Sequence, residues 1–175
     1  PYRFRLVNHR QVNAFTTMGG FVYVNTGLLA IADSEAEVAG VLAHELGHLD
    51  GRHGVKKLQQ RAIQQGILSA AGLRRNQAIQ LGVELALRRP NSRQDELAAD
   101  ELGLGIVDRA GYALIGLPRF LERLMNQAEP PTILSTHPST ADRVERLLSK
   151  IPADRASQGD GLDPQAYRWV KDQLR

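Results

Sequence analysis

The sequence contains no cysteine, which excludes disulfide bonds and thiolate metal ligands. Long apolar runs are also missing: there is no window of about 18 uninterrupted apolar residues, so we expect no transmembrane helix. The N-terminus lacks the charged and apolar regions of a signal peptide. Because the chain begins at Pro1 rather than Met and opens directly on a strand-like pattern, we expect a processed or trimmed fragment.

The charge pattern gives little support for a nucleic-acid partner. The 175 residues carry a formal net charge of +3, and 42% of them are hydrophobic, which is enough for one domain with its own core. The arginines are scattered among acidic residues, so we interpret them as a solvated surface and expect no binding to nucleic acid. A peripheral association with anionic membrane surfaces stays open.

The most informative stretch is Val41–Leu49, which contains the pattern His44-Glu45-x-x-His48. In a helix, His44 and His48 lie one turn apart on the same face, so their imidazoles can converge on one metal ion. Zn²⁺ fits such a site because it accepts nitrogen ligands and needs no redox chemistry. Glu45 flanks that face and can take a proton from a zinc-bound water. The alternative is a helix whose two histidines are only polar surface residues.

A helix over residues 34–53 is predicted around this pattern. Ser34 as N-cap and Glu37 at the third helical position form a capping box. Gly47 lies between the two histidines, where a small residue lets another backbone come close. Apolar residues recur at helical spacing and make a face toward the core, namely Val38, Val41, Leu42, Leu46 and Leu49.

Residues 1–25 are predicted to form a small sheet that precedes all the helices, as in an α+β fold. Alternation in Tyr2–Val7 indicates a strand with one buried face, and Gln11–Met18 and Phe21–Val24 are two further strands. Gly19-Gly20 indicates a tight hairpin turn between the last two. A strand edge beside the metal helix can hold an extended peptide by β-augmentation; the alternative is a sheet that only covers the helix.

The segment after His48 differs from the longer metzincin pattern. That pattern requires a third histidine at position 54, where this chain has Gly54, and the histidine comes one position early, at His53. We therefore interpret His53 as a helix-end residue favoured by the helix dipole. Residues 54–89 are predicted to form two amphipathic helices broken near Gly72. These helices pack on the core or, alternatively, act as a lid or a membrane-resting hairpin.

A second helix, predicted over residues 92–110 and capped by Asn91 or Ser92, carries the pattern Glu96-x-x-x-Asp100. Glu96 can supply the carboxylate that completes a His₂Glu zinc site and leaves the fourth position to water. Asp100, one turn away on the same face, can accept a hydrogen bond from the outer nitrogen of a ligating imidazole. The pattern alone is weak, because any acidic helix contains it; the alternative is a solvated acidic face.

Two further candidates lie among the C-terminal helices predicted over residues 112–175. His137 stands in a proline-stiffened loop, and Arg143 in the helix that follows. Either can face the metal pocket and donate to the oxyanion that develops when water attacks a carbonyl. His137 can alternatively occupy the open zinc position and hold the enzyme latent. In the alternative without a function, His137 only packs within its loop and Arg143 is an ordinary surface residue.

Taken in order, these residues resemble the zinc metallopeptidase family of HtpX, the CAAX prenyl proteases and the BepA-type periplasmic proteases. The resemblance covers nearly the whole chain. Its motifs in this sequence are Asn13-Ala14-Phe15, the edge from Gly19 to Leu28, His44-Glu45-Leu-Gly-His48, Ser92-Arg93 before Glu96-Leu-Ala-Ala-Asp100, Ala110-Gly111-Tyr112, and Thr136-His137-Pro138 with Arg143.

The resemblance implies a gluzincin-like fold with assigned roles for the residues of the site. It implies one Zn²⁺ per chain, held by three ligands: His44, His48 and Glu96. Glu45 is then the catalytic base, Asp100 supports His44 from behind, and His137 and Arg143 lie near the site.

The function implied by this resemblance is that of a zinc metalloendopeptidase, formed by one domain over residues 1–175. Its expected substrates are unfolded or extended proteins and peptides. Because the membrane spans of HtpX and the prenyl proteases are absent here, the resemblance favours the soluble BepA-like branch. That branch implies a periplasmic or outer-membrane-associated role in envelope protein quality control. The alternative is a non-catalytic zinc module that binds unfolded protein or membrane surfaces.

Overall fold

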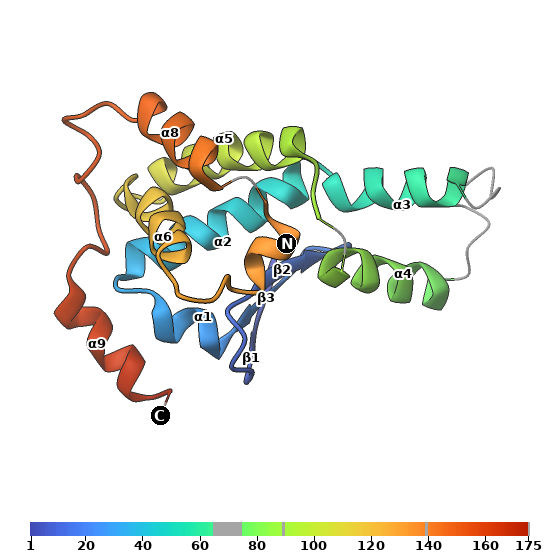
Figure 1. The fold of residues 1–175 in the computed structure, drawn as a ribbon, viewed down its shortest axis with the longest axis horizontal. Helices are drawn as coiled ribbons and strands as arrows, with labels where there is room; N and C mark the ends of the chain where they lie inside the picture. The colour runs from blue at the N-terminus through green and yellow to red at the C-terminus, as the bar shows by residue number, and fades with distance from the viewer. Residues whose placement is uncertain (65–74, 89, 139, 175) are drawn as a thin grey trace.

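The computed structural model describes residues 1–64, 75–88, 90–138 and 140–174, and these ranges form a mainly helical α+β fold. The strands come first and the helices follow, so the predicted fold class is confirmed (Figure 1). The strands of the sheet are β1 (Arg3–Val7), β2 (Ala14–Thr17) and β3 (Phe21–Asn25). The helices are α1 (Thr26–Ile31), α2 (Glu35–Asp50), α3 (His53–Gln64), α4 (Arg75–Arg88), α5 (Arg93–Arg109), α6 (Gly116–Met125), α7 (Ile133–Thr136), α8 (Thr140–Lys150) and α9 (Pro164–Asp172).

The sheet has the strand order β1-β3-β2, with β1 parallel and β2 antiparallel to β3. The β2–β3 hairpin turns at Gly19 and Gly20, whose φ angles are 93° and 81°. Glycine adopts such angles without the strain that a Cβ atom causes, so the predicted turn is confirmed. Within the described ranges β2 pairs only with β3, so its other edge is free, and β2 packs against α2 (Figure 1).

Strand β1 has no buried face, and the prediction of one is wrong. Phe4 and Leu6 lie on one side of the strand and are 50% and 61% exposed, as is Tyr2 just before the strand, by 48%; Val7, on the other side, is only partly buried. The physical reason is its position, because β1 joins the sheet beyond β3, while α2 packs against the other two strands. Alternation along a strand shows which side chains share a face, but it does not show whether another element covers that face.

Helix α2 begins as predicted and ends earlier than predicted. Ser34 is its N-cap, and its Oγ accepts a hydrogen bond from the backbone N–H of Glu37 at 3.3 Å. The second half of the capping box is replaced, because Glu37 Oε2 accepts from the N–H of Asp33 at 2.9 Å instead. The helix ends at Asp50, and a new helix, α3, begins at His53.

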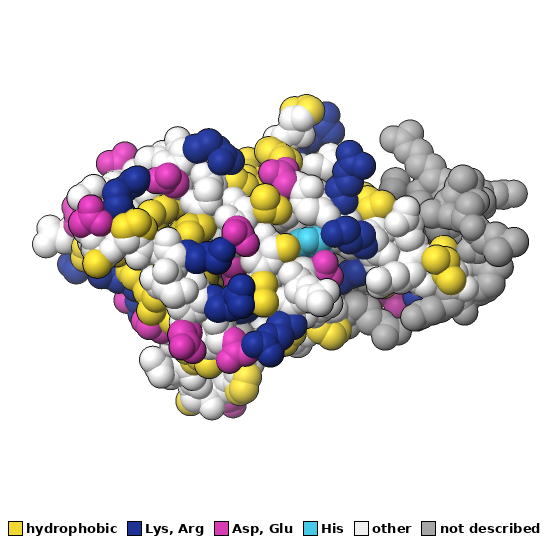
Figure 2. Space-filling model, turned by 90° about the horizontal axis from the view of Figure 1, so that it is seen from above, with side chains coloured by type: hydrophobic (Ala, Val, Ile, Leu, Met, Phe, Trp, Pro, Cys, Tyr) yellow, Lys and Arg dark blue, Asp and Glu magenta, His cyan; other side chains and the backbone are white. Residues whose placement is uncertain are grey.

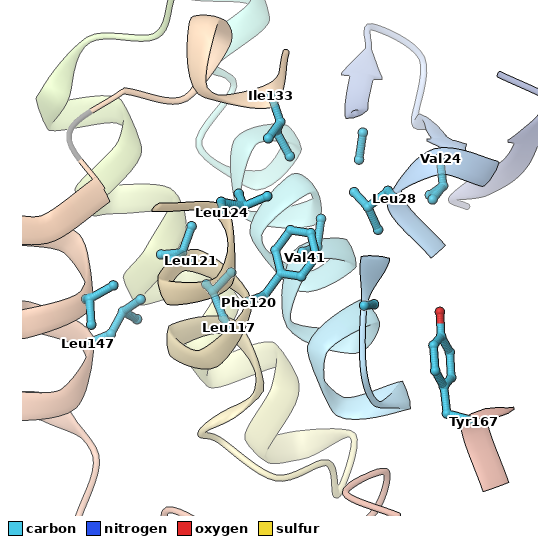
Figure 3. Packing of buried hydrophobic residues seen from close by; sticks show 13 residues of the cluster. Val24, Leu28, Val41, Leu117, Phe120, Leu121, Leu124, Ile133, Leu147 and Tyr167 are labelled. Atoms are coloured by element: carbon cyan, nitrogen blue, oxygen red, sulfur yellow. The ribbon is translucent and has the colours of Figure 1, made fainter. Parts of the chain in front are cut away.

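The hydrophobic core lies between α2 and α6 and extends to the sheet (Figure 3). Val41 of α2 faces Phe120 and Leu124 of α6, both of which are almost completely buried. The same cluster includes residues from α1, β3, α7, α8 and α9, among them Leu28, Val24, Ile133, Leu147 and Tyr167. The core thus holds the apolar side of α2 in place and leaves its histidine-bearing side to face other elements.

Helices α3 and α4 pack against each other and project to one side of the molecule (Figure 1). They correspond to the two helices predicted over residues 54–89, while the predicted break near Gly72 lies outside the described residues. Their role as a lid or hairpin stays a prediction. In the described part of the chain, no helix combines the length and the apolar character needed to span a bilayer.

Figure 2 shows basic and acidic side chains interspersed on one face of the molecule. No large field of a single sign covers the described part of that face. On this face the charges are mixed as they are along the sequence.

Candidate metal centre

Helices α2 and α5 lie side by side because small residues occupy their contact (Figure 1). A Cβ atom on Gly47 would lie only 2.5 Å from the carbonyl oxygen of Ala99, and one on Gly103 only 3.0 Å from the backbone nitrogen of His44. The two backbones therefore lie so close together that any side chain larger than hydrogen at these two positions would collide with the other helix. This contact turns the histidines of α2 toward the acidic residues of α5.

The structure brings the three predicted metal ligands together. His44 Nε2 and His48 Nε2 are 3.0 Å apart, Glu96 Oε2 is 3.4 Å from His44 Nε2, and Glu96 Oε1 is 3.2 Å from His48 Nε2. Ligands about 2.1 Å from a tetrahedral zinc ion are about 3.4 Å apart, so these separations fit a single ion. The donor set, two imidazole nitrogens and one carboxylate, is one that zinc accepts.

His137 places a fourth candidate metal-ligand atom at the same point. Its Nδ1 lies 3.0 Å from Glu96 Oε1 and 3.2 Å from His44 Nε2. All four side chains are buried, and their ligand atoms lie within 4.8 Å of one another, so the group could hold a metal ion. His137 follows the short helix α7, whose packing into the core through Ile133 carries the imidazole to the site.

Burial and charge act on the protonation of these groups in opposite directions. Burial raises the pKa of Glu96, but the charge of His137 and the hydrogen bonds from His137 and His44 outweigh it and hold that pKa well below its usual range. Burial lowers the pKa of His48 well below its usual value, so its imidazole is neutral. Burial and Arg143 also lower the pKa of His44, but the hydrogen bonds to Asp100 and Glu96 raise it to about 9.

Asp100 and Arg143 hold the site from behind. His44 Nδ1 lies 2.8 Å from Asp100 Oδ1, and Arg143 donates to both oxygens of Asp100 at 2.7 Å. Arg143 Nη1 lies 2.6 Å from Glu96 Oε2, and the arginine is only 1% exposed. Its contacts are thus with the carboxylates of α5 and, at 3.3 Å, with His44 Nδ1, and it is not among the described residues that line the large cavity beside the site.

Glu45 faces that cavity, which has a volume of about 270 Å³. Its walls come from β2, α2, α3 and α4, with Phe15, Met18, His48 and Leu85 among the lining residues. Glu45 is 1% exposed, and its Oε1 makes no hydrogen bond with the residues that the structure describes. The nearest basic group to Glu45 Oε1 in the ion-pair network is His137 Nε2, at 3.4 Å. A buried carboxylate oxygen without a donor is available to accept a proton.

Two residues of the site were assigned other roles from the sequence. The sequence predicts His53 as a residue at the end of the His44–His48 helix, which is wrong: it starts α3, is 2% exposed, and places Nδ1 2.7 Å from His48 Nδ1. Asn91 was considered only as a helix cap; Ser92 takes the cap, and Asn91 Nδ2 donates to Glu96 Oε1 at 2.6 Å. Nothing in the local pattern indicates either contact, since both depend on the path of a turn.

Comparison with known proteins shows the family to which the chain is related. The profile of peptidase family M48 matches residues 1–151. The beta-barrel assembly-enhancing protease of Escherichia coli is 32% identical over 189 aligned positions, which cover 98% of this chain and 37% of that protein. The mitochondrial metalloendopeptidase OMA1 of Arabidopsis thaliana is 37% identical, over 81% of this chain and 30% of that protein.

A shorter relative matches over more of its own length. The metalloprotease LoiP of Escherichia coli is 27% identical over 88% of this chain and 64% of that protein. The chain thus spans little more than a third of the beta-barrel assembly-enhancing protease. The family profile, the metallopeptidase relatives and the buried group of histidine and glutamate side chains agree, and the chain belongs to peptidase family M48, a family of metallopeptidases.

Proposed function

We propose that this chain is a zinc metalloendopeptidase that hydrolyses peptide bonds in unfolded or extended proteins. The observation that carries the proposal is the convergence of His44 Nε2, His48 Nε2 and a carboxylate oxygen of Glu96 at separations of 3.0 to 3.4 Å. His44, His48 and Glu96 are the metal ligands in this proposal. Zn²⁺ at this point would supply Lewis acidity, which lowers the pKa of water to about 7 and polarises a peptide carbonyl.

Glu45 is the proposed catalytic base. Its Oε1, which makes no hydrogen bond with the described residues, accepts a proton from the attacking water, and the same carboxyl group then donates that proton to the departing amine. The cavity beside Glu45 offers a place for the substrate chain. The free edge of β2 lies along this cavity and supports binding of an extended peptide by β-augmentation.

Asp100 and Arg143 are proposed to position the ligands. Asp100 accepts from the outer nitrogen of His44 and so fixes the tautomer that presents Nε2 to the metal. Arg143 fixes both Asp100 and Glu96 through charge-assisted contacts of 2.6 to 2.7 Å. These contacts, and the absence of Arg143 from the cavity wall, favour positioning over direct contact with an oxyanion.

His137 is proposed to hold the resting enzyme latent. Its Nδ1 lies among the ligand atoms, where it can take the coordination position that a water needs. The other role considered for His137, donation to the oxyanion, predicts the opposite result of a substitution. His137→Ala should raise peptidase activity if the side chain blocks the site, and lower it if the side chain stabilises the transition state.

The cellular role follows from the relatives by analogy. One relative is named as a protease that enhances beta-barrel assembly, and beta-barrel proteins of bacteria reside in the outer membrane. We propose a location in the bacterial envelope, periplasmic or associated with the outer membrane, and a role in protein quality control there. This chain spans only 37% of that relative. The proposal therefore does not include partners that the remaining part of the relative contacts.

The peptidase is tested with unfolded casein and zinc-loaded protein, with and without a chelator. Cleavage that the chelator abolishes supports the proposal. Glu45→Gln should keep the metal and lose cleavage, while Glu122→Gln, an exposed glutamate on α6, should behave as the wild type. Binding of casein without cleavage, by both wild type and His137→Ala, would instead support a non-catalytic zinc module. Full chelator-sensitive activity of Glu45→Gln would refute the role of Glu45.

A further inference from the structure

The outer nitrogen of His48, Nδ1, contacts a buried side chain. None of the roles predicted from the sequence explains this contact. His48 Nε2 faces Glu96 and His44, whereas Nδ1 points the other way, to His53 Nδ1 at 2.7 Å. His48 is 5% exposed and His53 only 2%, so both partners of this contact are buried, at the wall of the cavity beside Glu45. A ligating imidazole needs an acceptor for its outer N–H, and His44 finds one in Asp100. For His48, the structure offers His53.

The contact between two imidazoles determines which nitrogen of each carries the proton. A metal bound at Nε2 of His48 leaves the proton on Nδ1, so His48 donates and His53 Nδ1 accepts. His53 must then carry its own proton on Nε2. That atom lies 3.5 Å from Oδ1 of Asp95, a residue of α5 whose negatively charged carboxylate can accept from the N–H. Ser92 Oγ donates to the other oxygen of Asp95 at 2.7 Å and holds the carboxylate in place.

The backbone between α2 and α3 is built to make room for His53. A Cβ atom on Gly51 would lie 2.4 Å from His53 Nε2, so any larger residue would displace the imidazole. Arg52 has a φ angle of 53°, a left-handed backbone conformation that residues other than glycine rarely adopt. This turn ends α2 at Asp50 and folds the side chain of His53 back beneath His48. Strained backbone of this kind persists where the surrounding structure requires it.

We propose that His53, supported by Asp95, is a positioning residue that orients His48 toward the metal. The pair does for His48 what Asp100 and Arg143 do for His44. The inference rests on the proposed metal site, and it adds that the connection between α2 and α3 belongs to that site. Metal binding therefore depends on the hydrogen-bond acceptor at position 53, and not only on the packing of its side chain.

Zinc affinity provides the test, measured by competition with a chromophoric chelator. His53→Ala should bind zinc about 10 to 100 times more weakly than the wild type, as expected when the partner of a ligand is removed. His53→Asn should stay within about threefold of the wild type, because its amide oxygen can accept where Nδ1 did. Asp95→Ala, which leaves His53 in place without its support, should fall between these two variants.

Leu58→Ala is the matched structural control, since Leu58 is buried in the same helix and is 6% exposed. It should lower the free energy of unfolding of the metal-free protein and leave zinc affinity unchanged. The visible spectrum of the Co²⁺-substituted protein reports the geometry of the ligands, and it should change in His53→Ala but not in Leu58→Ala.

The outcomes separate this inference from the proposed function. If the wild type does not bind zinc at all, the proposed function fails. If the wild type binds zinc and His53→Ala binds it equally well, the inference fails alone. Equal losses of affinity in His53→Ala, His53→Asn and Leu58→Ala would also overturn it, because packing would then be the cause. Should His53→Ala not fold, unchanged affinity in Asp95→Ala would contradict the support assigned to Asp95.

Discussion

Gly47→Ala tests whether the close contact of α2 and α5 sets the geometry of the metal site. The added Cβ atom would lie 2.5 Å from the carbonyl oxygen of Ala99 and 3.0 Å from its Cα atom. An ordinary contact begins near 3.4 Å, so one backbone must move by about 0.9 Å. Because backbone atoms cannot rotate away as a side chain can, the two helices must separate.

The expected size of the effect follows from the tolerance of a metal site. Ligand distances in such sites hold within about 0.2 Å, so a shift of this size disturbs the distance from His48 to Glu96. A misplacement of about 1 Å costs on the order of 100-fold in rate, and we expect a loss of that size in casein cleavage. Overpacking should destabilise the protein by about 1–3 kcal/mol, offset in part by the better helix propensity of alanine, about 1 kcal/mol.

Gly105→Ala is the matched control on α5. A Cβ atom there would meet only the end of the flexible Arg109 side chain, at 3.4 Å. This variant should gain about 0.5–1 kcal/mol in the free energy of unfolding and keep zinc affinity and activity. Urea denaturation and chelator competition measure both quantities. If Gly47→Ala is as stable, as active and as tight in zinc binding as Gly105→Ala, the helix contact does not set the site.

Three further predictions address the surroundings of the site and the core. Asp100→Ala should weaken zinc binding by about 10 to 100-fold in chelator competition, because the group that accepts from the outer nitrogen of His44 is lost; unchanged affinity would contradict this. Arg123→Ala should lower the free energy of unfolding by about 2 kcal/mol in urea, because Glu37, 2% exposed, loses two hydrogen bonds; a change below about 0.5 kcal/mol would refute the importance of the pair. Burial raises the pKa of Tyr167 to about 12, so the folded state binds its proton where the unfolded state has lost it; stability should fall as pH rises from about 10 toward 12, and less in Tyr167→Phe.

The helix-borne parts of the site were predictable because a helix has a fixed period. His44 and His48 are four positions apart, as are Glu96 and Asp100, and that spacing alone places each pair on one face. Gly47 indicated a close approach of another backbone, and Ala99 is the residue that makes it. The N-cap residues Ser34 and Ser92 were also predictable, because each accepts a hydrogen bond from a backbone N–H only three residues away.

The contacts that depend on loops were not predictable. His53 reaches His48 only because Arg52 turns the chain through a left-handed conformation, which its residue type does not favour. Asn91 reaches Glu96 through a connection whose path is set by packing of distant elements, whereas His137 was a candidate from the sequence whose contact with Glu96 only the fold determines. The exposure of β1 likewise depends on which strands α2 contacts, and alternation in the strand cannot show that.

The central claim is that His44, His48 and Glu96 hold one metal ion between α2 and α5. Anomalous diffraction from zinc-loaded crystals, recorded on both sides of the zinc absorption edge, tests this claim most directly. The account predicts one strong peak about 2.0–2.2 Å from His44 Nε2, His48 Nε2 and a carboxylate oxygen of Glu96. A crystal with full zinc content and no peak between these three side chains, or with the peak at other residues, would contradict it.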